Sequence, residues 1–122
     1  MKTVLIADDA VFMRMMLKDI LTKIGWTVTG EAENGEEAVH MFSRLKPDLV
    51  LIDILMPFKD GLQAAQEIIS YEPNAKIIMI SAFGQEAQLK KAVEIGTMDF
   101  IKKPFSPEKV RETINKVFNN SV

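Results

Sequence analysis

The chain has 122 residues, a length that predicts one domain with one hydrophobic core and leaves no room for a second domain. Its 48% hydrophobic and 26% charged fractions are those of a folded globular protein and exclude wholesale disorder. The net charge of −2 at pH 7 argues against a nucleic-acid partner, and the absence of cysteine excludes thiolate chemistry and fits a reducing compartment, so we expect a cytoplasmic protein.

Five short runs rich in β-branched residues predict strands, and they cover residues 3–7, 27–32, 49–52, 76–80 and 99–102. The first, third and fourth runs are almost continuously apolar, as strands covered on both faces are, so we expect them to be central. The first run is also too short for a secretion signal or a membrane span, and two aspartates end it. We therefore expect no association with a membrane.

A segment of helical periodicity follows each predicted strand. The apolar stripes comprise Met13, Leu17, Ile20 and Ile24; Ala38, Phe42 and Leu45; Leu62, Ala65 and Ile69; Leu89, Ala92 and Val93; and Val110, Ile114, Val117 and Phe118. Residues typical of helix ends flank these segments: Asn34 with Glu37 and Ser106 with Pro107 at expected starts, and Gly25 and Gly96 at expected ends.

This alternation predicts an α/β fold of the (βα)5 type, an open parallel five-stranded sheet with helices on both faces. Parallel neighbours need crossover connections, which are overwhelmingly right-handed and place helices over the sheet. A closed eight-stranded barrel would need about twice this length. No repeat or linker interrupts the pattern, so residues 1–122 are expected to form a single domain.

Polar side chains follow four of the predicted strands, at the sheet edge where ligands bind in folds of this class. They are Asp8, Asp9, Asp53, Ser81 and Lys103. Three ionised carboxylates a few Å apart repel one another by about 2–4 kcal/mol per pair at an effective dielectric near 20, so they favour a bound cation. An all-oxygen site with room for water suits Mg²⁺ or Mn²⁺, and Ca²⁺ stays an alternative although the sequence has no loop built for it.

Phosphoryl transfer needs an in-line nucleophile and positive charge on the equatorial oxygens, and these residue types can supply both. Asp53 is the candidate nucleophile. A metal held by Asp8 and Asp9 would cover one phosphoryl oxygen, Lys103 a second, and the Ser81 hydroxyl or backbone N–H groups a third.

Each of these residues also has a simpler interpretation. Asp9 could cap the first helix, Asp53 could be a strand-end turn residue, and Lys103 a solvated surface lysine. Their convergence on one edge argues against these readings. Ser81 is the least secure member because serine is common after strands, while Lys102 is expected to point away from the site into solvent.

Four motifs in this order resemble the receiver domains of two-component response regulators, and among them the stand-alone chemotaxis members, over the whole chain. The motifs are Asp8-Asp9, Asp53-Ile-Leu-Met-Pro57 followed by Asp60-Gly61, Ser81-Ala82, and Lys103-Pro104-Phe105. The resemblance implies a receiver domain over residues 1–122 with the flavodoxin-like strand order 2-1-3-4-5, which is already known for this family. It also implies that a histidine kinase of the CheA type donates the phosphoryl group.

By this resemblance the backbone carbonyl of Leu55 joins Asp9 and Asp53 as a metal ligand, Asp8 acts mostly through water, and the Lys103–Pro104 bond is cis. The family's switch pair falls on Ser81 and Phe100: the hydroxyl moves to the phosphoryl group and the aromatic ring turns inward. Here the aromatic residue is Phe rather than the Tyr common in chemotaxis members, so a steric coupling remains without the phenol's hydrogen bond.

Bulky apolar residues stand at two positions that, by resemblance, influence how water reaches the acyl phosphate. They are Leu55 and Phe83. Our hypothesis is that self-hydrolysis of the phosphorylated form is slow.

The favoured function is therefore a signalling switch in chemotaxis, not a turnover enzyme. No effector segment follows the last predicted helix, so a monomer would act through contact with a flagellar motor switch protein or another chemotaxis protein, and a phosphatase would reset it. A phosphorelay intermediate is the alternative. A less favoured alternative is a phosphatase with an aspartyl nucleophile. Such an enzyme usually has an Asp-x-Asp motif after the first strand and a cap region, and this sequence has neither. A flavin-binding carrier of similar topology would not place two aspartates in its phosphate loop.

Overall fold

The computed structural model describes residues 2–119 and contains five strands that alternate with five helices. The elements are β1 (Thr3–Ala7), α1 (Val11–Lys23), β2 (Thr27–Ala32), α2 (Gly35–Leu45), β3 (Leu49–Asp53), α3 (Gly61–Tyr71), β4 (Ile77–Ser81), α4 (Glu86–Ile95), β5 (Asp99–Lys102) and α5 (Pro107–Asn119). None of the described helices combines the length and apolar character that crossing a bilayer requires.

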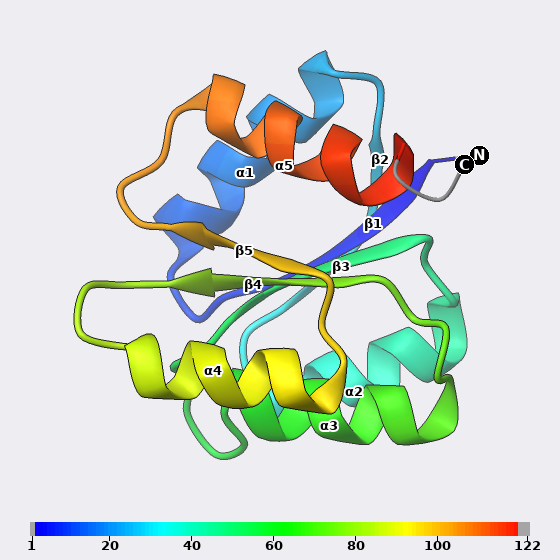
Figure 1. Cartoon of the computed structure of the whole chain (residues 1–122). Helices are drawn as coiled ribbons and strands as arrows, with labels where there is room; N and C mark the ends of the chain where they lie inside the picture. Colours follow the sequence, from blue (N-terminus) through cyan, green and yellow to red (C-terminus); the bar gives the residue numbers. More distant parts are fainter. Residues whose placement is uncertain (1, 120–122) are drawn as a thin grey trace.

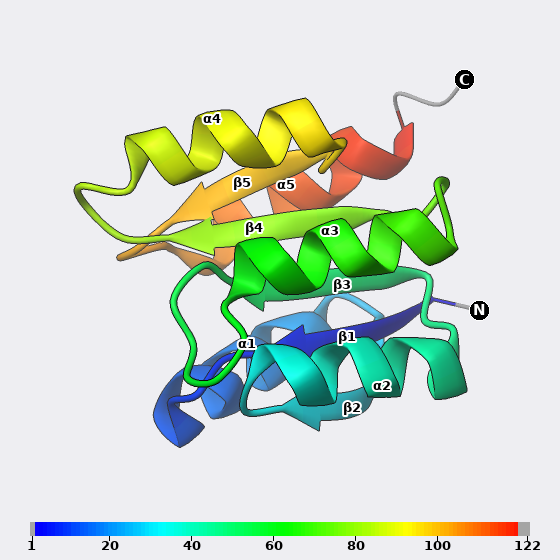
Figure 2. The same ribbon diagram turned by 90° about the horizontal axis from the view of Figure 1, so that it is seen from below.

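All five strands pair in parallel in one sheet of order β2-β1-β3-β4-β5. Helices α1 and α5 cover one face, and α2, α3 and α4 cover the other (Figure 1). Figure 2 shows the same layers from below, with the α2–α4 layer in front of the sheet. The predicted α/β fold, its strand order and the helices on both faces are confirmed.

Each face of the sheet has its own apolar core. Along β1, Val4 and Ile6 pack toward α1 and α5, whereas Leu5 and Ala7 pack toward α2 and α3, because successive side chains of a strand point to opposite faces. Strands β1, β3 and β4 are buried almost throughout, and the edge strands β2 and β5 are partly exposed. The expectation that the three apolar runs are central is confirmed. Full burial of each large aliphatic side chain contributes about 1.5–3 kcal/mol.

The predicted helix-end signals are found where expected. The Asn34 side chain accepts a hydrogen bond from the Glu37 backbone N–H at 2.8 Å, and the Ser106 hydroxyl accepts one from the Lys109 N–H at 3.1 Å. Gly96 ends α4 with φ of 108°, a left-handed conformation that glycine adopts without steric cost. These local signals place the loops that carry the polar strand-end residues.

Two strands extend further toward their carboxyl ends than predicted. β3 includes Asp53 and β4 runs to Ser81 instead of ending at residue 80. The cause is backbone pairing, since Asp53 pairs with Ile80 and Ser81 pairs with Lys102. Hydrophobic composition alone does not show where such pairing stops. Both polar residues are thus fixed by the sheet rather than by a loop.

Candidate functional site

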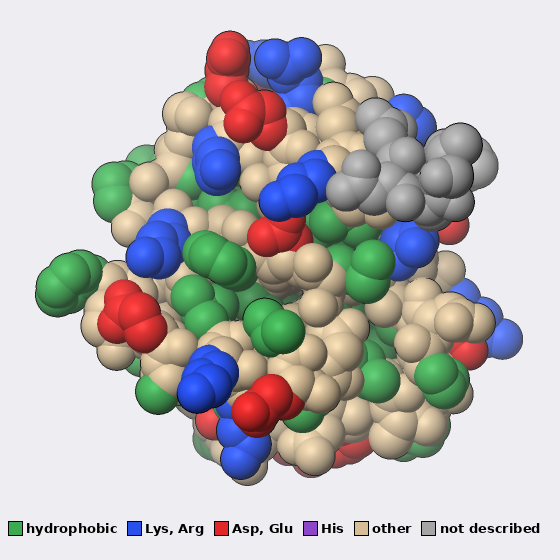
Figure 3. Space-filling model, viewed as in Figure 1, with side chains coloured by type: hydrophobic (Ala, Val, Ile, Leu, Met, Phe, Trp, Pro, Cys, Tyr) green, Lys and Arg blue, Asp and Glu red, His purple; other side chains and the backbone are tan. Residues whose placement is uncertain are grey.

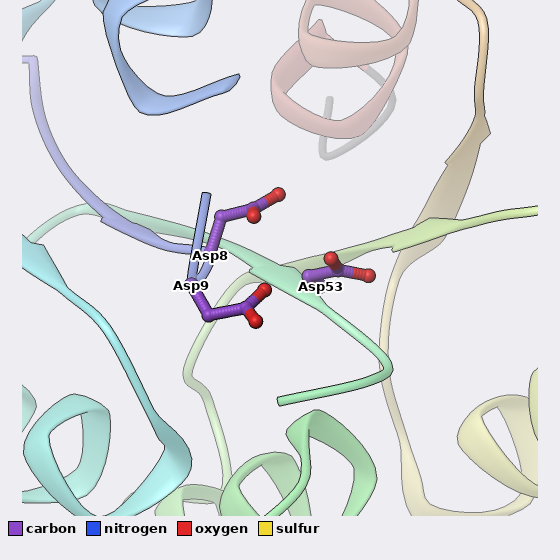
Figure 4. Close-up of side chains that lie close together, drawn as sticks. All are labelled: Asp8, Asp9 and Asp53. Carbon is purple, nitrogen blue, oxygen red and sulfur yellow. The ribbon is translucent and has the colours of Figure 1, made fainter. Parts of the chain in front are cut away.

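Three carboxylates meet at the carboxyl-terminal edge of the sheet. Asp8 and Asp9 follow β1, and Asp53 is the last residue of β3, the strand beside it. One oxygen from each carboxylate lies within 4.8 Å of the other two (Figure 4). Asp8 and Asp53 are buried, whereas Asp9 is exposed. Residues far apart in sequence therefore form one acidic cluster that opens to solvent on the Asp9 side.

Lys103 brings a positive charge to this cluster from the loop after β5. Its Nζ lies 2.9 Å from Oδ2 of Asp53 and 3.4 Å from Oδ2 of Asp8. The Lys103–Pro104 peptide bond is cis, as the resemblance implied. Lys102 is exposed, in agreement with the expectation that it faces away from the site.

The protonation of the site follows from burial and charge. Burial raises the pKa of Asp53 above its ordinary value of 3.8, and the repulsion from Asp8 adds to this effect, while the hydrogen bond and attraction from Lys103 oppose it. Burial alone would lower the pKa of Lys103, but Asp53 and Asp8 together raise it. Lys103 therefore stays protonated. Its single positive charge does not fully offset the cost of burying an ionised Asp53 beside Asp8.

Asp8 and Asp9 differ in what holds them. The Asp8 carboxylate accepts a hydrogen bond from the Ala10 backbone N–H at 2.9 Å. Helix α1 begins after Ala10 without a side-chain cap, so the alternative in which Asp9 caps this helix is wrong. Within residues 2–119, no hydrogen bond or ion pair orients the Asp9 carboxylate. Its oxygens are therefore available to a ligand.

Ser81 and Phe100, the expected switch pair, lie on adjacent strands. Ser81 is buried and its hydroxyl has no hydrogen-bond partner among the described residues, while its backbone carbonyl accepts from the Lys103 N–H at 2.7 Å. An unpaired buried hydroxyl costs about 1–3 kcal/mol and favours a state that supplies a partner. Phe100 is 38% exposed on β5. The switch role of this pair stays a prediction.

The two apolar residues expected to control water access both face solvent. Leu55 is 61% exposed and Phe83 is 97% exposed. Leu55 lies in the loop that begins directly after β3, and Phe83 lies in the loop between β4 and α4. The predicted metal contact of the Leu55 carbonyl stays a prediction.

Two glycines hold the loop that follows Asp53, and sequence reasoning had not given them this role. A Cβ atom at Gly61 would collide with the carbonyl oxygen of Asp53, and one at Gly35 would collide with that of Lys59. The Gly61 N–H also donates to the Ile54 carbonyl at 2.8 Å. Because only glycine permits these approaches, both residues fix the loop beside Asp53. The Asp60-Gly61 motif was the signal for one of them.

Gln85 and Arg14 are buried polar residues next to the site that sequence reasoning also missed. The Gln85 side chain accepts a hydrogen bond from the Ala82 backbone N–H at 2.6 Å and so closes the loop after Ser81. Arg14 donates to the Asp8 carbonyl oxygen at 2.7 Å. A charged residue on the same helical stripe as Leu17 and Leu21 was the available signal for Arg14.

This donor set fits a hard divalent cation. The three clustered side chains each offer a carboxylate oxygen, and Lys103 brings one ammonium group to two of them. Oxygen ligands and excess negative charge are what Mg²⁺ and related ions select. The geometry therefore suits a metal ion and, beside it, an anionic group in contact with Lys103 and Asp53.

Comparison with known proteins places this arrangement in a family context. Residues 4–115 match the family described as the response regulator receiver domain. The chain is 57% identical over 116 residues to the chemotaxis protein CheY of Thermotoga maritima, covering 95% of this chain and 97% of that protein. It is 51% identical over 116 residues to CheY of Bacillus subtilis, with coverage of 95% and 97%.

Solved structures agree with these sequence matches. The crystal structure of a CheX–CheY complex with BeF3 and Mg²⁺ from Borrelia burgdorferi superposes with a TM-score of 0.91 at 38% identity, covering 95% of this chain and 88% of that one. The response regulator domain of Thermotoga maritima CheB gives a TM-score of 0.85 at 36% identity, covering 96% and 93%. The resemblance to receiver domains, including stand-alone chemotaxis members, is confirmed.

Proposed function

This chain belongs to the family of response regulator receiver domains, and on that premise we propose that phosphorylation of Asp53 switches its affinity for a protein target in chemotaxis. Its similarity to two proteins named chemotaxis protein CheY supports this function. The observation that carries the proposal is that Asp9 and Asp53 share one acidic cluster while Lys103 lies 2.9 Å from Asp53.

The proposed chemistry is transfer of a phosphoryl group from a phosphohistidine to Asp53. A carboxylate oxygen of Asp53 bonds to phosphorus while the bond from phosphorus to the donor's histidine nitrogen breaks. The freed imidazole takes up a proton from solvent. Lys103, 2.9 Å from Asp53, holds one phosphoryl oxygen and keeps the carboxylate oriented. The Ser81 hydroxyl, buried and without a hydrogen-bond partner in the described part of the chain, is the donor proposed for another oxygen.

We assign the metal ligands to Asp9, Asp53 and the backbone carbonyl of Leu55, with Asp8 acting mostly through water. A bound Mg²⁺ or Mn²⁺ ion supplies positive charge next to the phosphoryl oxygens. The solved neighbour from Borrelia burgdorferi contains Mg²⁺ together with BeF3. The acidic cluster supports the same use here, as does the Asp9 carboxylate, which has no partner among residues 2–119.

The proposed output surface is the face formed by α4, β5 and α5. Figure 3 shows hydrophobic side chains gathered there over β5, with lysines and acidic residues around them. A groove of about 570 Å³ on this face includes Phe100, Lys102, Lys109 and Lys116. Movement of the Ser81 hydroxyl toward the phosphoryl group and of the Phe100 ring inward would change this surface. That change links chemistry at Asp53 to partner binding.

The proposed partners follow from the family. A CheA-like histidine kinase is the donor, a flagellar motor switch protein or another chemotaxis protein is the target, and a phosphatase resets the switch, all in the cytoplasm. The chain is proposed to be a monomer that does not turn over substrate. An assay for phosphate release from small phosphomonoesters tests the last point, because an aspartyl phosphatase would release phosphate catalytically and a switch would not.

The decisive experiment compares partners captured with and without BeF3 and Mg²⁺, which mimic the phosphoryl group. We expect a partner retained only with the mimic. The matched control is Asp53→Asn, which should capture the same partners in both conditions. An identical partner set for the parent chain in both conditions would contradict the switch.

A further inference from the structure

Arg14 is a buried cation that takes no part in the proposed transfer. It lies in the first turns of α1, its side chain is 10% exposed, and it faces β2 and the end of β1 rather than the acidic cluster. Burying a guanidinium is costly unless its donors are paired. The groups that accept hydrogen bonds from Arg14 should therefore explain why a charged residue occupies this buried position.

The guanidinium joins β2 to the residue that follows β1. Its Nε donates to Oε1 of Glu31 on β2 at 3.1 Å, and one terminal nitrogen donates to the backbone carbonyl oxygen of Asp8 at 2.7 Å. Glu31 is held from its other oxygen by Lys18 at 3.6 Å. The planar fork of an arginine fits two acceptors in fixed directions, which a lysine ammonium does not.

The Asp8 carbonyl belongs to the peptide bond that joins the two N-terminal aspartates. Asp8 is anchored at its own N–H, which donates to the Ala32 carbonyl at 3.0 Å, and at its carboxylate, which accepts from the Ala10 N–H. Asp9 has no such anchor, since nothing in the described part of the chain orients its carboxylate. The peptide that leads into Asp9 is the one whose carbonyl oxygen accepts from Arg14.

We propose that Arg14 is a positioning residue for the metal site: by fixing the Asp8–Asp9 peptide against β2 through Glu31, it aims the Asp9 carboxylate at the position shared with Asp53. The proposal rests on the proposed function, because it needs Asp9 to be a ligand. It adds to that function a residue that supports the metal site from the β2 side of β1.

The test measures Mg²⁺ affinity directly, by NMR titration of the unphosphorylated chain, and does not depend on phosphorylation. Arg14→Lys keeps the charge and loses the fork, and we expect its Kd for Mg²⁺ to rise about tenfold, the lower end of the range for residues that support metal ligands. Amide dispersion in the same spectra reports whether the variant is folded. Lys18→Met is the matched control, because Lys18 touches Glu31 but not Asp8, and it should stay within twofold of the parent.

Two further variants keep the proposal testable. Glu31→Gln leaves Arg14 and all three aspartates in place, and its Kd should rise about threefold even if Arg14→Lys fails to fold. In an Asp9→Asn background, Arg14→Lys should change the remaining Mg²⁺ affinity by less than twofold, since the two residues act in series.

Distinct outcomes separate the two proposals. A parent chain that binds no Mg²⁺ overturns the proposed function and this inference together. A parent that binds Mg²⁺, with folded Arg14→Lys and Glu31→Gln variants of unchanged Kd, overturns the role of Arg14 alone. A Lys18→Met variant as weak as Arg14→Lys also overturns it, because losing a contact that does not reach Asp8 would then weaken the site as much as losing the one that does.

Discussion

The ammonium nitrogen of Lys103 lies 2.9 Å from an oxygen of Asp53, and the same nitrogen is 3.4 Å from Asp8. One cation from the loop after β5 thus joins carboxylates at the ends of β1 and β3. Without a metal ion it is the group that offsets their repulsion, and with a phosphoryl group attached it is placed to bind one oxygen. Its removal should therefore affect both stability and chemistry.

Lys103→Met is expected to lower the free energy of unfolding of the metal-free protein at pH 7 by about 2 kcal/mol, because two buried carboxylates lose their partner. Urea denaturation in EDTA measures this change. Lys102→Met is the matched control, since Lys102 is exposed, and should change stability by less than about 0.5 kcal/mol. Equal effects of the two substitutions would mean that the ion pair does not support the fold.

Asp53→Asn should stabilise the metal-free protein at neutral pH. The pKa of Asp53 is raised in the folded state, so folding disfavours the ionised carboxylate. The protonated carboxyl therefore contributes stability that is fully present below the ordinary pKa of 3.8 and is lost as pH rises through the raised pKa. We expect Asn to gain about 1 kcal/mol at pH 7. Denaturation across a pH series should show this gain shrinking as pH falls toward 3.8. A variant less stable than the parent at pH 7 would contradict the assignment.

Magnesium should stabilise the fold by mass action, by about 1.4 kcal/mol at a concentration ten times its Kd. Thermal unfolding with and without EDTA measures this difference. Asp9→Asn should remove most of it, whereas Asp19→Asn should keep it, because Asp19 pairs with Lys23 on the exposed face of α1. Equal stabilisation of the Asp9 and Asp19 variants would place the ion elsewhere.

The sequence contained most of the fold and the polar core of the site. Continuously apolar runs marked the central strands, and parallel topology obliges residues after neighbouring strands to meet, which is why Asp8, Asp53 and Lys103 could be grouped without coordinates. The ends of β3 and β4 could not be placed as well, because Asp53 and Ser81 join the sheet through backbone pairing that hydrophobicity does not report.

The supporting residues were harder to predict because their roles depend on tertiary contact. Arg14 pairs with Glu31, which lies on another element. Gln85 accepts a hydrogen bond from a loop whose path the sequence does not fix. Gly61 is needed because α3 begins against the backbone of Asp53. Sequence patterns identify groups with chemistry of their own more readily than groups that hold a backbone in place.

Leu55→Asn and Phe83→Gln should shorten the lifetime of phosphorylated Asp53. Both side chains are exposed and apolar, in the loops that follow β3 and β4, and polar replacements can orient a water molecule toward phosphorus. We expect an increase in hydrolysis rate of about tenfold or more for the double variant, within the range for positioned proton-transfer groups. Loss of radiolabel measures it. Tyr71→Gln, an exposed residue at the end of α3, is the control, and unchanged decay in the double variant would defeat the hypothesis.

The most direct test of the account locates the phosphoryl group itself. The chain is incubated with phosphoramidate, whose P–N bond resembles that of phosphohistidine, and the phosphorylated peptide is identified by mass spectrometry. We predict one base-labile phosphoryl group on Asp53, formed only with Mg²⁺ and absent from Asp53→Asn. Phosphorylation of another residue, or equal labelling of Asp53 in EDTA, would contradict the acidic site as the place where this protein accepts phosphate.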